Sequence, residues 1–561
     1  MDYLNRMAPS EVLTHRLLER RAAEAPDALF FSFQNESFTL GHCNRMANRM
    51  ARNLQEAGIT TGTHVAVFMD TSAEYMYLWM ALSKVGAVEV PINTAYRGDV
   101  LKHVLHTCQA TACILDDRFI DTVDEASFGF AQFKQVFAAP GRASALPPRG
   151  QHLASLLAPN DESNLTLLPR YDDVTCIIFT SGTTGTSKGV MLSHHCLTGG
   201  GLIYAEINDL CSDDVLMNFL PFFHCAAKFL TIATLACGGR MLLQPRLSIS
   251  TFWHEVRAHG VTNFMGVGGI CNMLVSRPEM ADDAKTTIRT IYAVPDPADI
   301  HKELERRFGC TVTTVYGSTE GGLSLFRSVS DAYRPNSCGR PGPYYEVQIV
   351  DADDNPVPVG TSGEIVVRPK RPFLIGSGYI GMPERTVKTW RNLWLHTGDR
   401  GHADADGFYY FDDRVSDSIR RRGENISSFE VESLVSKHPA VSEAVAVPTA
   451  SEIGEDEVWV LVVPRQGQTI EPEDLLVHCS RYMPYFMIPR FIEIVTDFPR
   501  TSTAKVEKFR IRASGPDAKA WDREAHGWKV TREGLFSMDG QLVVSFGSSR
   551  SKAPSNLSAN E

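Results

Sequence analysis

The chain has 561 residues, of which 43% are hydrophobic and 22% charged, and its formal net charge is −11 at pH 7. A chain of this length is too long for a single hydrophobic core, so at least two domains are expected. The negative net charge argues against nucleic acid as the main partner. The 12 cysteines form no C-x-x-C pair, so they give no zinc pattern and favour reduced thiols in the cytoplasm. No apolar run approaches the roughly 20 residues of a membrane span.

The N-terminal part alternates between helical and strand patterns. Residues 10–24 and 75–85 have helical spacing, whereas 64–69 and 87–92 are typical of buried strands. This alternation favours an α/β class in which helices pack on mostly parallel sheets. Residues 120–169 are weakly patterned and contain several prolines, so an irregular connection is predicted there.

A loop of small polar residues follows the apolar segment 177–179. It contains Thr180, Ser181, Gly182, Thr183, Thr184 and Gly185, and it ends at Lys188 before a second strand. Backbone N–H groups, hydroxyls and one cation suit a phosphate. The loop is not a Walker loop, because Lys188 leads into a strand rather than a helix. It is predicted to close over a polyphosphate; the alternative is a surface hairpin turn, although such turns usually have about 2 to 5 residues.

The second half continues with strands, helices and then a smaller unit. Strands are predicted at 215–223, 262–269 and 407–414, a helix at 249–259, and a hairpin from 347–350 and 364–368. After residue 427, helices at 429–436 and 472–482 and strands at 443–447, 458–463 and 491–495 predict a small α+β unit. A short hairpin is expected at 528–546, and residues from 548 onward have the composition of a disordered tail.

The segment T-S-G-T-T-G-x-x-K-G resembles the phosphate-loop signature of the adenylate-forming superfamily, and further motifs of that family follow in the same order across residues 10–512. The resemblance implies a large N-terminal domain of stacked, mostly parallel sheets with helices at 1–413 and a hinge at 414–416. It also implies a small α+β C-terminal domain at 417–515 that rotates between two working positions. Residues 516–561 are then a C-terminal extension.

Two motifs resemble the nucleotide-binding motifs of this family. The first is Tyr316-Gly317-Ser318-Thr319-Glu320, which implies that Tyr316 stacks on adenine, Thr319 contacts the α-phosphate and Glu320 binds Mg²⁺. The second contains Asp399, which is implied to accept hydrogen bonds from the ribose hydroxyls, with Arg414 also reaching the nucleotide. Taken alone, each motif is an ordinary turn.

Other segments resemble the parts of the family that act on the acyl group and the thiol. His224 corresponds to a residue at the acyl pocket, although a His beside Phe and Cys is otherwise a packed core residue. Lys505 corresponds to a lysine that stabilises the carboxylate and α-phosphate, a contribution of about 100- to 1000-fold in rate; without the motif it is a solvated charge. Lys188, His224, Thr319 and Lys505 are therefore the predicted catalytic residues.

The segment 420–427 resembles the loop that replaces this lysine after rotation and forms the pantetheine tunnel. It includes Gly423 and Glu424, and its R-G-E-N-I-S form resembles the carnitine/crotonobetaine-CoA ligase branch. The three arginines at 420–422 either meet phosphates of coenzyme A or form a solvated face.

The resemblance implies an acyl-CoA ligase that uses ATP, coenzyme A and Mg²⁺. A carboxylate attacks the α-phosphate of ATP, which gives an acyl-adenylate and pyrophosphate, and the thiol of coenzyme A then displaces AMP. Two alternatives stay open: a free-standing adenylation enzyme that loads a carrier protein, and a non-catalytic binder of nucleotide or acyl-adenylate. A cytoplasmic protein is expected, and the sequence leaves open whether it forms a homodimer.

Three departures from the family pattern concern its chemistry. Val294 and Pro295 replace small residues that let the backbone approach adenine and acyl group. Ala504 replaces a glycine before the late lysine, at a cost of about 1 kcal/mol or more if φ is positive there. Ser416 replaces Asp or Lys at the hinge. The hypothesis is that adenylation is weak or lost, so that the enzyme mainly converts a preformed acyl-adenylate to its thioester.

The sequence gives only an indication of which carboxylic acid is the substrate. Gly266, Gly268 and Gly269 fall where the family lines its acyl pocket. They either leave volume for a bulky acid or mark a tight turn filled by neighbouring side chains.

Overall fold

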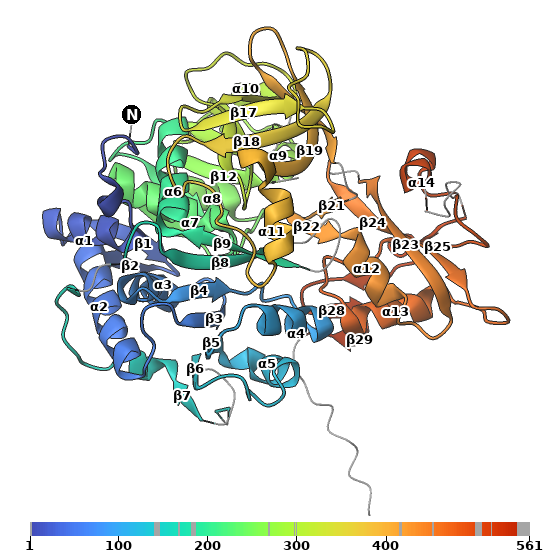
Figure 1. Cartoon of the computed structure of the whole chain (residues 1–561), viewed down its shortest axis with the longest axis horizontal. Helices are drawn as coiled ribbons and strands as arrows, with labels where there is room; N and C mark the ends of the chain where they lie inside the picture. The colour runs from blue at the N-terminus through green and yellow to red at the C-terminus, as the bar shows by residue number, and fades with distance from the viewer. Residues whose placement is uncertain are drawn as a thin grey trace, which may run out of the picture.

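Two large sheets and a group of smaller sheets make up the protein (Figure 1). The structure is a computed structural model, and it describes residues 3–139, 146–147, 149–166, 169–180, 187–267, 270–294, 296, 298, 300–414, 418–451, 454–499, 506, 508–517 and 519–546.

The first large sheet has 7 strands, and all but one of its neighbouring pairs are parallel. The exception is the last pair, which is an antiparallel hairpin. In spatial order the strands are β7 (Gly150–His152), β6 (Gln135–Ala139), β5 (Ala112–Asp116), β3 (His64–Phe68), β4 (Val88–Pro91), β8 (Val174–Thr180) and β9 (Lys188–Ser193).

The second large sheet has 13 strands and changes from antiparallel to parallel pairing along its width. Its parallel region contains β14 (Thr311–Ser318), β13 (Thr290–Val294), β12 (Asn263–Val267), β10 (Val215–Asn218), β11 (Arg240–Leu243) and β1 (Leu29–Phe33), and β2 (Glu36–Thr39) closes that edge. Its antiparallel region contains β17 (Tyr345–Val350), β18 (Gly363–Pro369), β19 (Leu395–Ala403), β20 (Tyr409–Arg414), β16 (Ser337–Pro341) and β15 (Gly322–Arg327).

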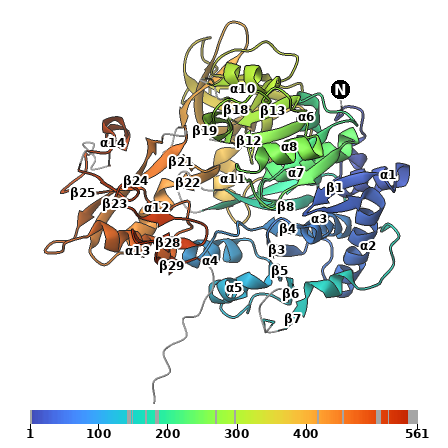
Figure 2. The same ribbon diagram turned by 180° about the vertical axis from the view of Figure 1, so that it is seen from behind.

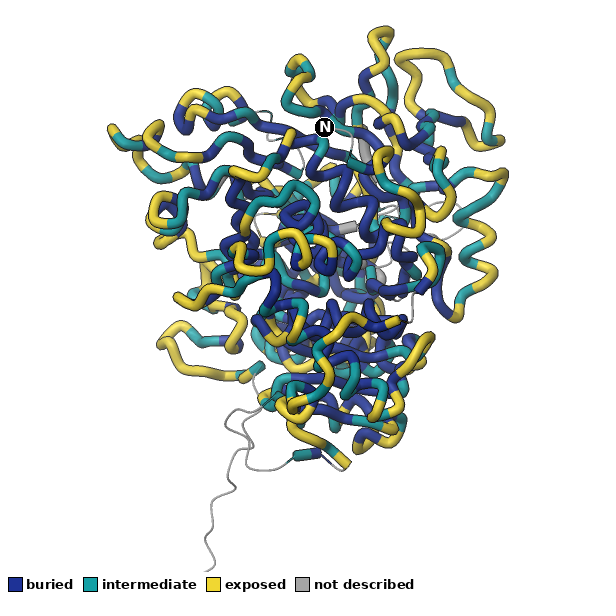
Figure 3. Tube along the Cα trace, turned by 90° about the vertical axis from the view of Figure 1, so that its left-hand side faces the viewer, coloured by how far each residue is buried: buried dark blue, intermediate teal, exposed yellow. Residues whose placement is uncertain are grey.

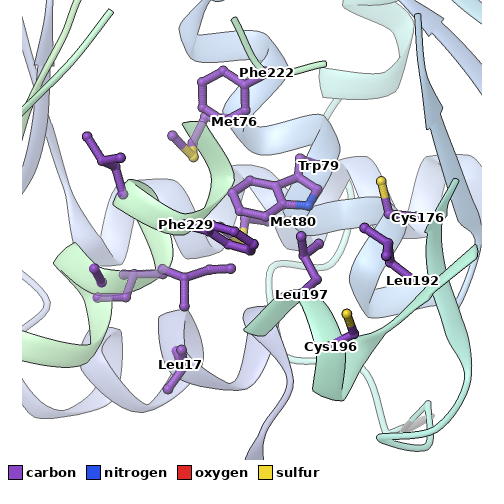
Figure 4. Close-up of a cluster of buried hydrophobic side chains, with 14 of the residues drawn as sticks. Leu17, Met76, Trp79, Met80, Cys176, Leu192, Cys196, Leu197, Phe222 and Phe229 are labelled. Carbon is purple, nitrogen blue, oxygen red and sulfur yellow. The ribbon is translucent and has the colours of Figure 1, made fainter. Parts of the chain in front are cut away.

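Five helices share one hydrophobic core with both large sheets. They are α1 (Thr14–Glu24), α2 (Leu40–Glu56), α3 (Ala73–Val85), α6 (His194–Ile207) and α7 (Cys225–Cys237). Trp79 of α3 lies at the centre of this core, where Figure 4 shows it between Phe222, Phe229 and Leu197. Local signals define α3, because the Oγ of Ser72 accepts a hydrogen bond from Tyr75 N at 3.1 Å and Gly86 ends the helix at φ +72°. Figure 3 shows buried residues along these inner elements and exposed residues on the outer loops.

The remaining helices of the large part lie around these layers (Figures 1 and 2). They are α4 (Gly98–Thr107), α5 (Ile120–Ala126), α8 (Phe252–His259), α9 (Ile270–Ser276), α10 (His301–Phe308) and α11 (Pro383–Thr389). No helix in the described part of the chain combines the length and apolarity needed to cross a bilayer.

The smaller sheets belong to the C-terminal part, on the right in Figure 1. The hairpin of β21 (Ser418–Arg421) and β22 (Glu424–Ser427) precedes α12 (Ser428–Val435). A sheet of 4 strands follows, with β23 (Val441–Ala450), β24 (Asp456–Pro464), β25 (Phe491–Ile494) and β26 (Trp521–Asp522), together with α13 (Pro472–Tyr482) and α14 (Lys508–Ser514). The last sheet has 3 strands, β27 (Lys529–Val530), β28 (Gly534–Phe536) and β29 (Leu542–Ser545).

The predicted α/β class, with a large part of mostly parallel sheets and helices and a smaller α+β part, is confirmed. The prediction of an irregular connection over residues 120–169 was wrong, because α5, β6 and β7 lie within it. β6 is short, with only three buried residues, and it extends the 7-stranded sheet beside β5. Tertiary pairing rather than a strong local pattern defines this strand. The expected tail from residue 548 lies outside the described residues.

Candidate active site

A cavity of about 1510 Å³ lies where strands of both large sheets end beside the β21–β22 hairpin. Its lining includes Thr180 at the end of β8, Ser318 at the end of β14, Val294 at the end of β13 and Phe219 just after β10. Arg422, in the turn of the hairpin, lines it from the C-terminal part. Ligands of parallel α/β sheets bind at such carboxyl ends of strands.

The predicted phosphate loop connects two paired strands, as expected. β8 and β9 are antiparallel and Thr180 pairs with Lys188, so the loop is a strand connection. Lys188 lines the cavity, and its Nζ lies 4.8 Å from the ring centroid of Tyr379. The loop residues themselves lie outside the described residues: Ser181, Gly182, Thr183, Thr184 and Gly185.

The end of this loop is bonded to the C-terminal part. The backbone N–H and the Oγ of Ser187 each donate to Oε1 of Glu430, at 2.8 Å in both cases. Glu430 is buried near the start of α12, and burial raises its pKa while the bonds from Ser187 oppose that shift. Across β9 from α12, the carbonyl of Ser187 lies 2.8 Å from Nε2 of His103 in α4. Ser187 therefore connects three segments: the end of the predicted phosphate loop, α12 and α4.

Tyr316 and Asp399, which were predicted to contact one nucleotide, lie together. The hydroxyl of Tyr316 donates to Oδ2 of Asp399 at 2.7 Å. Burial, and then the charge of Asp399, raise the pKa of Tyr316 well above its usual value, so it stays a donor. Asp399 lines the cavity, as do Val315 and Gly317 on either side of Tyr316. The hydroxyl of Tyr316 thus orients the carboxylate of Asp399, which lines the cavity.

The remaining residues of the Tyr316 motif end β14 and begin the turn to β15. A Cβ atom added to Gly317 would lie 2.2 Å from the carbonyl oxygen of Gly322, so this end of the strand pair requires glycine. Ser318 accepts a hydrogen bond from Gly321 N at 2.9 Å and also lines the cavity. Thr319 bonds to Cys225, and although this bond opposes it, burial raises the pKa of that thiol to about 12. Cys225 is therefore not a thiolate nucleophile.

Glu320 is held at the cavity by one phenol. Tyr379 donates to its Oε1 at 2.9 Å, and burial together with the nearby carboxylate raises the pKa of Tyr379. No group of three or more His, Cys, Asp or Glu side chains suited to a metal occurs among the described residues. A cavity carboxylate such as Glu320 fits Mg²⁺, which uses one or two carboxylates plus substrate phosphates and keeps several waters.

The β21–β22 hairpin brings Glu424 to His224. Their Oε2 and Nε2 atoms are 3.4 Å apart, and Asn93 donates to Oε1 of Glu424 at 3.4 Å. The turn residues Arg422 and Gly423 have φ of 54° and 78°, the positive values that a two-residue type I′ turn needs. All of these except Asn93 had been predicted, and His224 is a partly exposed cavity residue rather than a core histidine.

The three arginines at 420–422 have three different environments. Arg421 is buried and pairs with Glu457 at 2.7 Å, and burial lowers its pKa to about 9. The guanidinium of Arg420 donates to the carbonyl of Val294 at 3.4 Å. Only Arg422 is exposed, and it lines the cavity. The segment is therefore neither a uniform phosphate cluster nor a uniform solvated face.

Part of the cavity lining is apolar. Phe222, Phe223, Phe229, Met265, Tyr292 and Leu323 form this part. The space beside Gly266 is already filled, because an added Cβ would lie 2.6 Å from the Sγ of Cys271. Gly266 therefore leaves no free volume for an acid, and it lies within β12 rather than in a turn, whereas Gly268 and Gly269 lie outside the described residues.

Several predicted residues cannot be placed. Lys505, Ala504, Ser416 and Pro295 lie outside the described residues. Arg414 pairs with Asp399 across β19 and β20, which puts its backbone beside the site. Tyr379, Asn93 and Glu430 were missed, because each acts through a partner that is distant in the sequence.

Comparisons with known proteins identify the family of the chain. Residues 18–380 match the family described as AMP-binding enzyme, and residues 430–505 match its C-terminal domain. The chain therefore belongs to the family of AMP-binding enzymes. This membership confirms the predicted enzyme class, an AMP-forming acid–CoA ligase that uses ATP, coenzyme A and Mg²⁺.

A crotonobetaine/carnitine–CoA ligase of Salmonella paratyphi A is 30% identical over 485 residues, which cover 85% of this chain and 93% of that protein. ATP-bound MatB from Rhodopseudomonas palustris is 25% identical with a TM-score of 0.66, covering 90% of this chain and 99% of that one. The o-succinylbenzoate CoA synthetase MenE from Bacillus subtilis, bound with a product analogue, has the same fold at 23% identity and a TM-score of 0.78, covering 89% and 98%.

Proposed function

We propose that this enzyme joins an apolar carboxylic acid to coenzyme A through an acyl-adenylate, and that it mainly performs the second, thioester-forming step. The observation that carries the proposal is the position of the β21–β22 hairpin, whose Glu424 lies 3.4 Å from His224 inside the cavity that Asp399 and Glu320 also line. A thiol that enters along this hairpin is directed toward the acyl end of the cavity.

Each side chain has a proposed role in holding the adenylate. Asp399, which Tyr316 orients, is proposed to accept hydrogen bonds from the ribose hydroxyls. Gly317 and Ser318 line the cavity as well, and Arg414 is the strand partner of Asp399. Lys188 and Thr319 are proposed to neutralise and position the α-phosphate. The loop from Thr180 to Gly185 is proposed to bind the pyrophosphate portion of ATP.

Glu320 would hold Mg²⁺, which when bound neutralises phosphate charge. In the thioester step the sulfur forms a bond to the acyl carbon, the bond from that carbon to the AMP oxygen breaks, and the thiol loses its proton. His224 and the hairpin residues Gly423 and Glu424 lie where the acyl carbon would be positioned for this attack. Lys505 is proposed to serve the adenylation step instead.

The carboxylic acid substrate is proposed to be largely apolar, since aromatic and aliphatic side chains form part of the cavity lining. Weak adenylation is proposed from two departures. Val294 lines the cavity where the family has a small residue, and Ala504 replaces glycine before the late lysine.

The test uses a panel of acids and their presynthesised adenylates, with pyrophosphate release and CoA ester measured separately. We expect ester formation from an adenylate with coenzyme A alone and slow pyrophosphate exchange from the acid. Robust exchange with the same acid would refute weak adenylation. Failure of every adenylate to react with coenzyme A would leave a carrier-loading enzyme or a binder instead.

Ala504→Gly tests the backbone argument directly. If the position before Lys505 needs a positive φ, glycine removes about 1 kcal/mol or more of strain, so pyrophosphate exchange should rise by about 5-fold or more. Thioester formation from a supplied adenylate should not change, and it serves as the internal control.

A further inference from the structure

The C-terminal extension forms part of the cavity wall, although it lies beyond both family matches, the second of which ends at residue 505. Arg532 and Glu533, between β27 and β28, and Phe546, after β29, line the cavity together with residues from both large sheets. Figures 1 and 2 both place β28 and β29 between α13 and α4. The extension is therefore located at the same opening as the β21–β22 hairpin.

Apolar packing fixes this extension on the C-terminal part. Val530 and Leu535 are buried in the same hydrophobic cluster as Met483 and Phe486, which follow α13. Phe546 packs against that cluster from its edge. Burying a large apolar side chain contributes about 1.5–3 kcal/mol, so the two buried residues help to hold this short sheet in place.

Arg97, just before α4, ties the extension to the large N-terminal part. Its Nε and one terminal nitrogen donate to the carbonyl of Phe546 at 3.2 and 3.0 Å, and its other terminal nitrogen donates to the carbonyls of Thr94 and Tyr96, both at 2.7 Å. Burial lowers its pKa to about 10. This guanidinium is fully engaged by backbone carbonyls, so its role is to hold the extension.

Arg532, in contrast, presents its charge at the opening. It is exposed, and its Nε donates to the hydroxyl of Tyr485 at 3.2 Å while the guanidinium carbon lies 5.7 Å from that ring's centroid. Arg422 belongs to a hairpin that is bonded to the same 483–488 segment, because its neighbour Arg421 donates to the carbonyls of Phe486 and Ile488 at 3.0 and 2.9 Å.

Within the described part of the chain, neither Arg532 nor Arg422 has a carboxylate partner for its side chain. Two carboxylates of the cavity lining, Glu455 and Asp70, have other partners. Glu455 accepts from the backbone N–H groups of Arg422 and Gly423, and Asp70 pairs with Arg118. Two guanidinium groups therefore face the opening through which a thiol must enter the cavity.

We infer that Arg532 and Arg422 bind the phosphates at the nucleotide end of coenzyme A, so that the extension is part of the coenzyme A site. The inference rests on the proposed ligation to coenzyme A. With its thiol directed along the hairpin toward His224, the pantetheine arm extends back past the turn at Arg422, which leaves the phosphates near that turn. Guanidinium groups bind phosphates through two parallel hydrogen bonds, and an aromatic ring beside Arg532 holds that group in place.

The test compares Arg532→Ala with the wild type, using a supplied acyl-adenylate and three thiols: coenzyme A, dephospho-coenzyme A and pantetheine. The KM for coenzyme A should rise about 10-fold at low salt, with kcat unchanged, whereas the KM for pantetheine should keep its wild-type value. Arg532→Lys should recover part of the loss, since it keeps the charge but not the fork. Arg481→Ala, at an exposed arginine of α13 that does not line the cavity, is the matched control and should change neither KM.

The three thiols also locate the phosphate. A rise confined to coenzyme A assigns Arg532 to the 3′-phosphate, and an equal rise for dephospho-coenzyme A assigns it to the diphosphate; both support the inference. An unchanged KM for coenzyme A, or an equal rise for pantetheine, would overturn it. If the wild type acylates none of the three thiols, the proposed function fails instead, so the two failures are distinguishable.

Discussion

A fully buried ion pair lies directly behind the active site and allows a quantitative test of the fold. Nζ of Lys228 in α7 lies 2.9 and 2.7 Å from the two oxygens of Glu89 in β4, and both side chains have no exposed surface. Tyr75 donates to the same carboxylate at 2.9 Å, and the ammonium group lies 4.4 Å from the ring centroid of Trp79. Because α7 begins directly after His224, this pair also fixes a residue of the cavity.

Lys228→Met removes the cation while keeping a similar side-chain volume. Glu89 then stays buried with only neutral partners, the phenol of Tyr75 at 2.9 Å and the weak thiol donor of Cys176 at 3.8 Å, and an uncompensated buried charge costs about 3–5 kcal/mol. The double variant with Glu89→Gln removes the remaining charge but keeps an acceptor for Tyr75. Its free energy of unfolding should therefore lie within about 1 kcal/mol of the wild type.

Urea unfolding followed by tryptophan fluorescence measures this difference, because Trp79 lies against the pair. The midpoint should fall in the single variant and largely recover in the double variant, without a change in the urea dependence of the free energy. Glu279→Gln is the matched control, since Glu279 pairs with Arg306 at the surface with 52% and 56% of the side chains exposed. It should leave the unfolding midpoint close to that of the wild type, since an exposed ion pair contributes little to stability. A double variant as unstable as Lys228→Met would refute the reasoning, because lost packing would then explain the effect.

Three other carboxylates give predictions of their own. Burial raises the pKa of Asp116 to about 7, so the contribution of its protonated form to stability is complete below pH ~4 and is lost as the pH rises toward 7. In Asp116→Asn the melting temperature should therefore fall less over this pH range than in the wild type. Identical pH profiles of the two melting temperatures would contradict the prediction. Asp399→Asn should weaken AMP binding about 10- to 100-fold by calorimetry, which an unchanged affinity would exclude. Glu424→Ala should slow ester formation from a supplied adenylate about 10-fold and leave pyrophosphate exchange unchanged; the reverse pattern would remove the hairpin from the thioester step.

Local patterns predicted much of the fold. The helix at 472–482 and the strands at 491–495 and 458–463 were placed within one or two residues, because apolar spacing and a proline at the helix start are local signals. The strand expected at 215–223 ends at Asn218, since the apolar residues that follow it line the cavity instead of continuing the sheet. Apolar residues therefore mark buried segments more reliably than they mark strand ends.

The site was only partly predictable for a different reason. Motifs locate residues such as Asp399 and Glu320, whose neighbours in the sequence belong to the same turn. Nothing local indicates that Glu430 bonds to Ser187, which is 243 positions away, or that Tyr379 orients Glu320. Such pairs depend on how distant elements meet, and single-sequence patterns do not contain that information.

The bonds between Ser187 and Glu430 also limit how the two parts can move. α12 cannot leave β9 without breaking both of them, and Ser187 is the last residue before the strand that begins at Lys188. Departure of the C-terminal part would thus remove both bonds to Glu430 at the downstream end of the loop and leave the one between the Ser187 carbonyl and His103. The same two bonds couple the movement of the C-terminal part to the segment proposed to bind ATP.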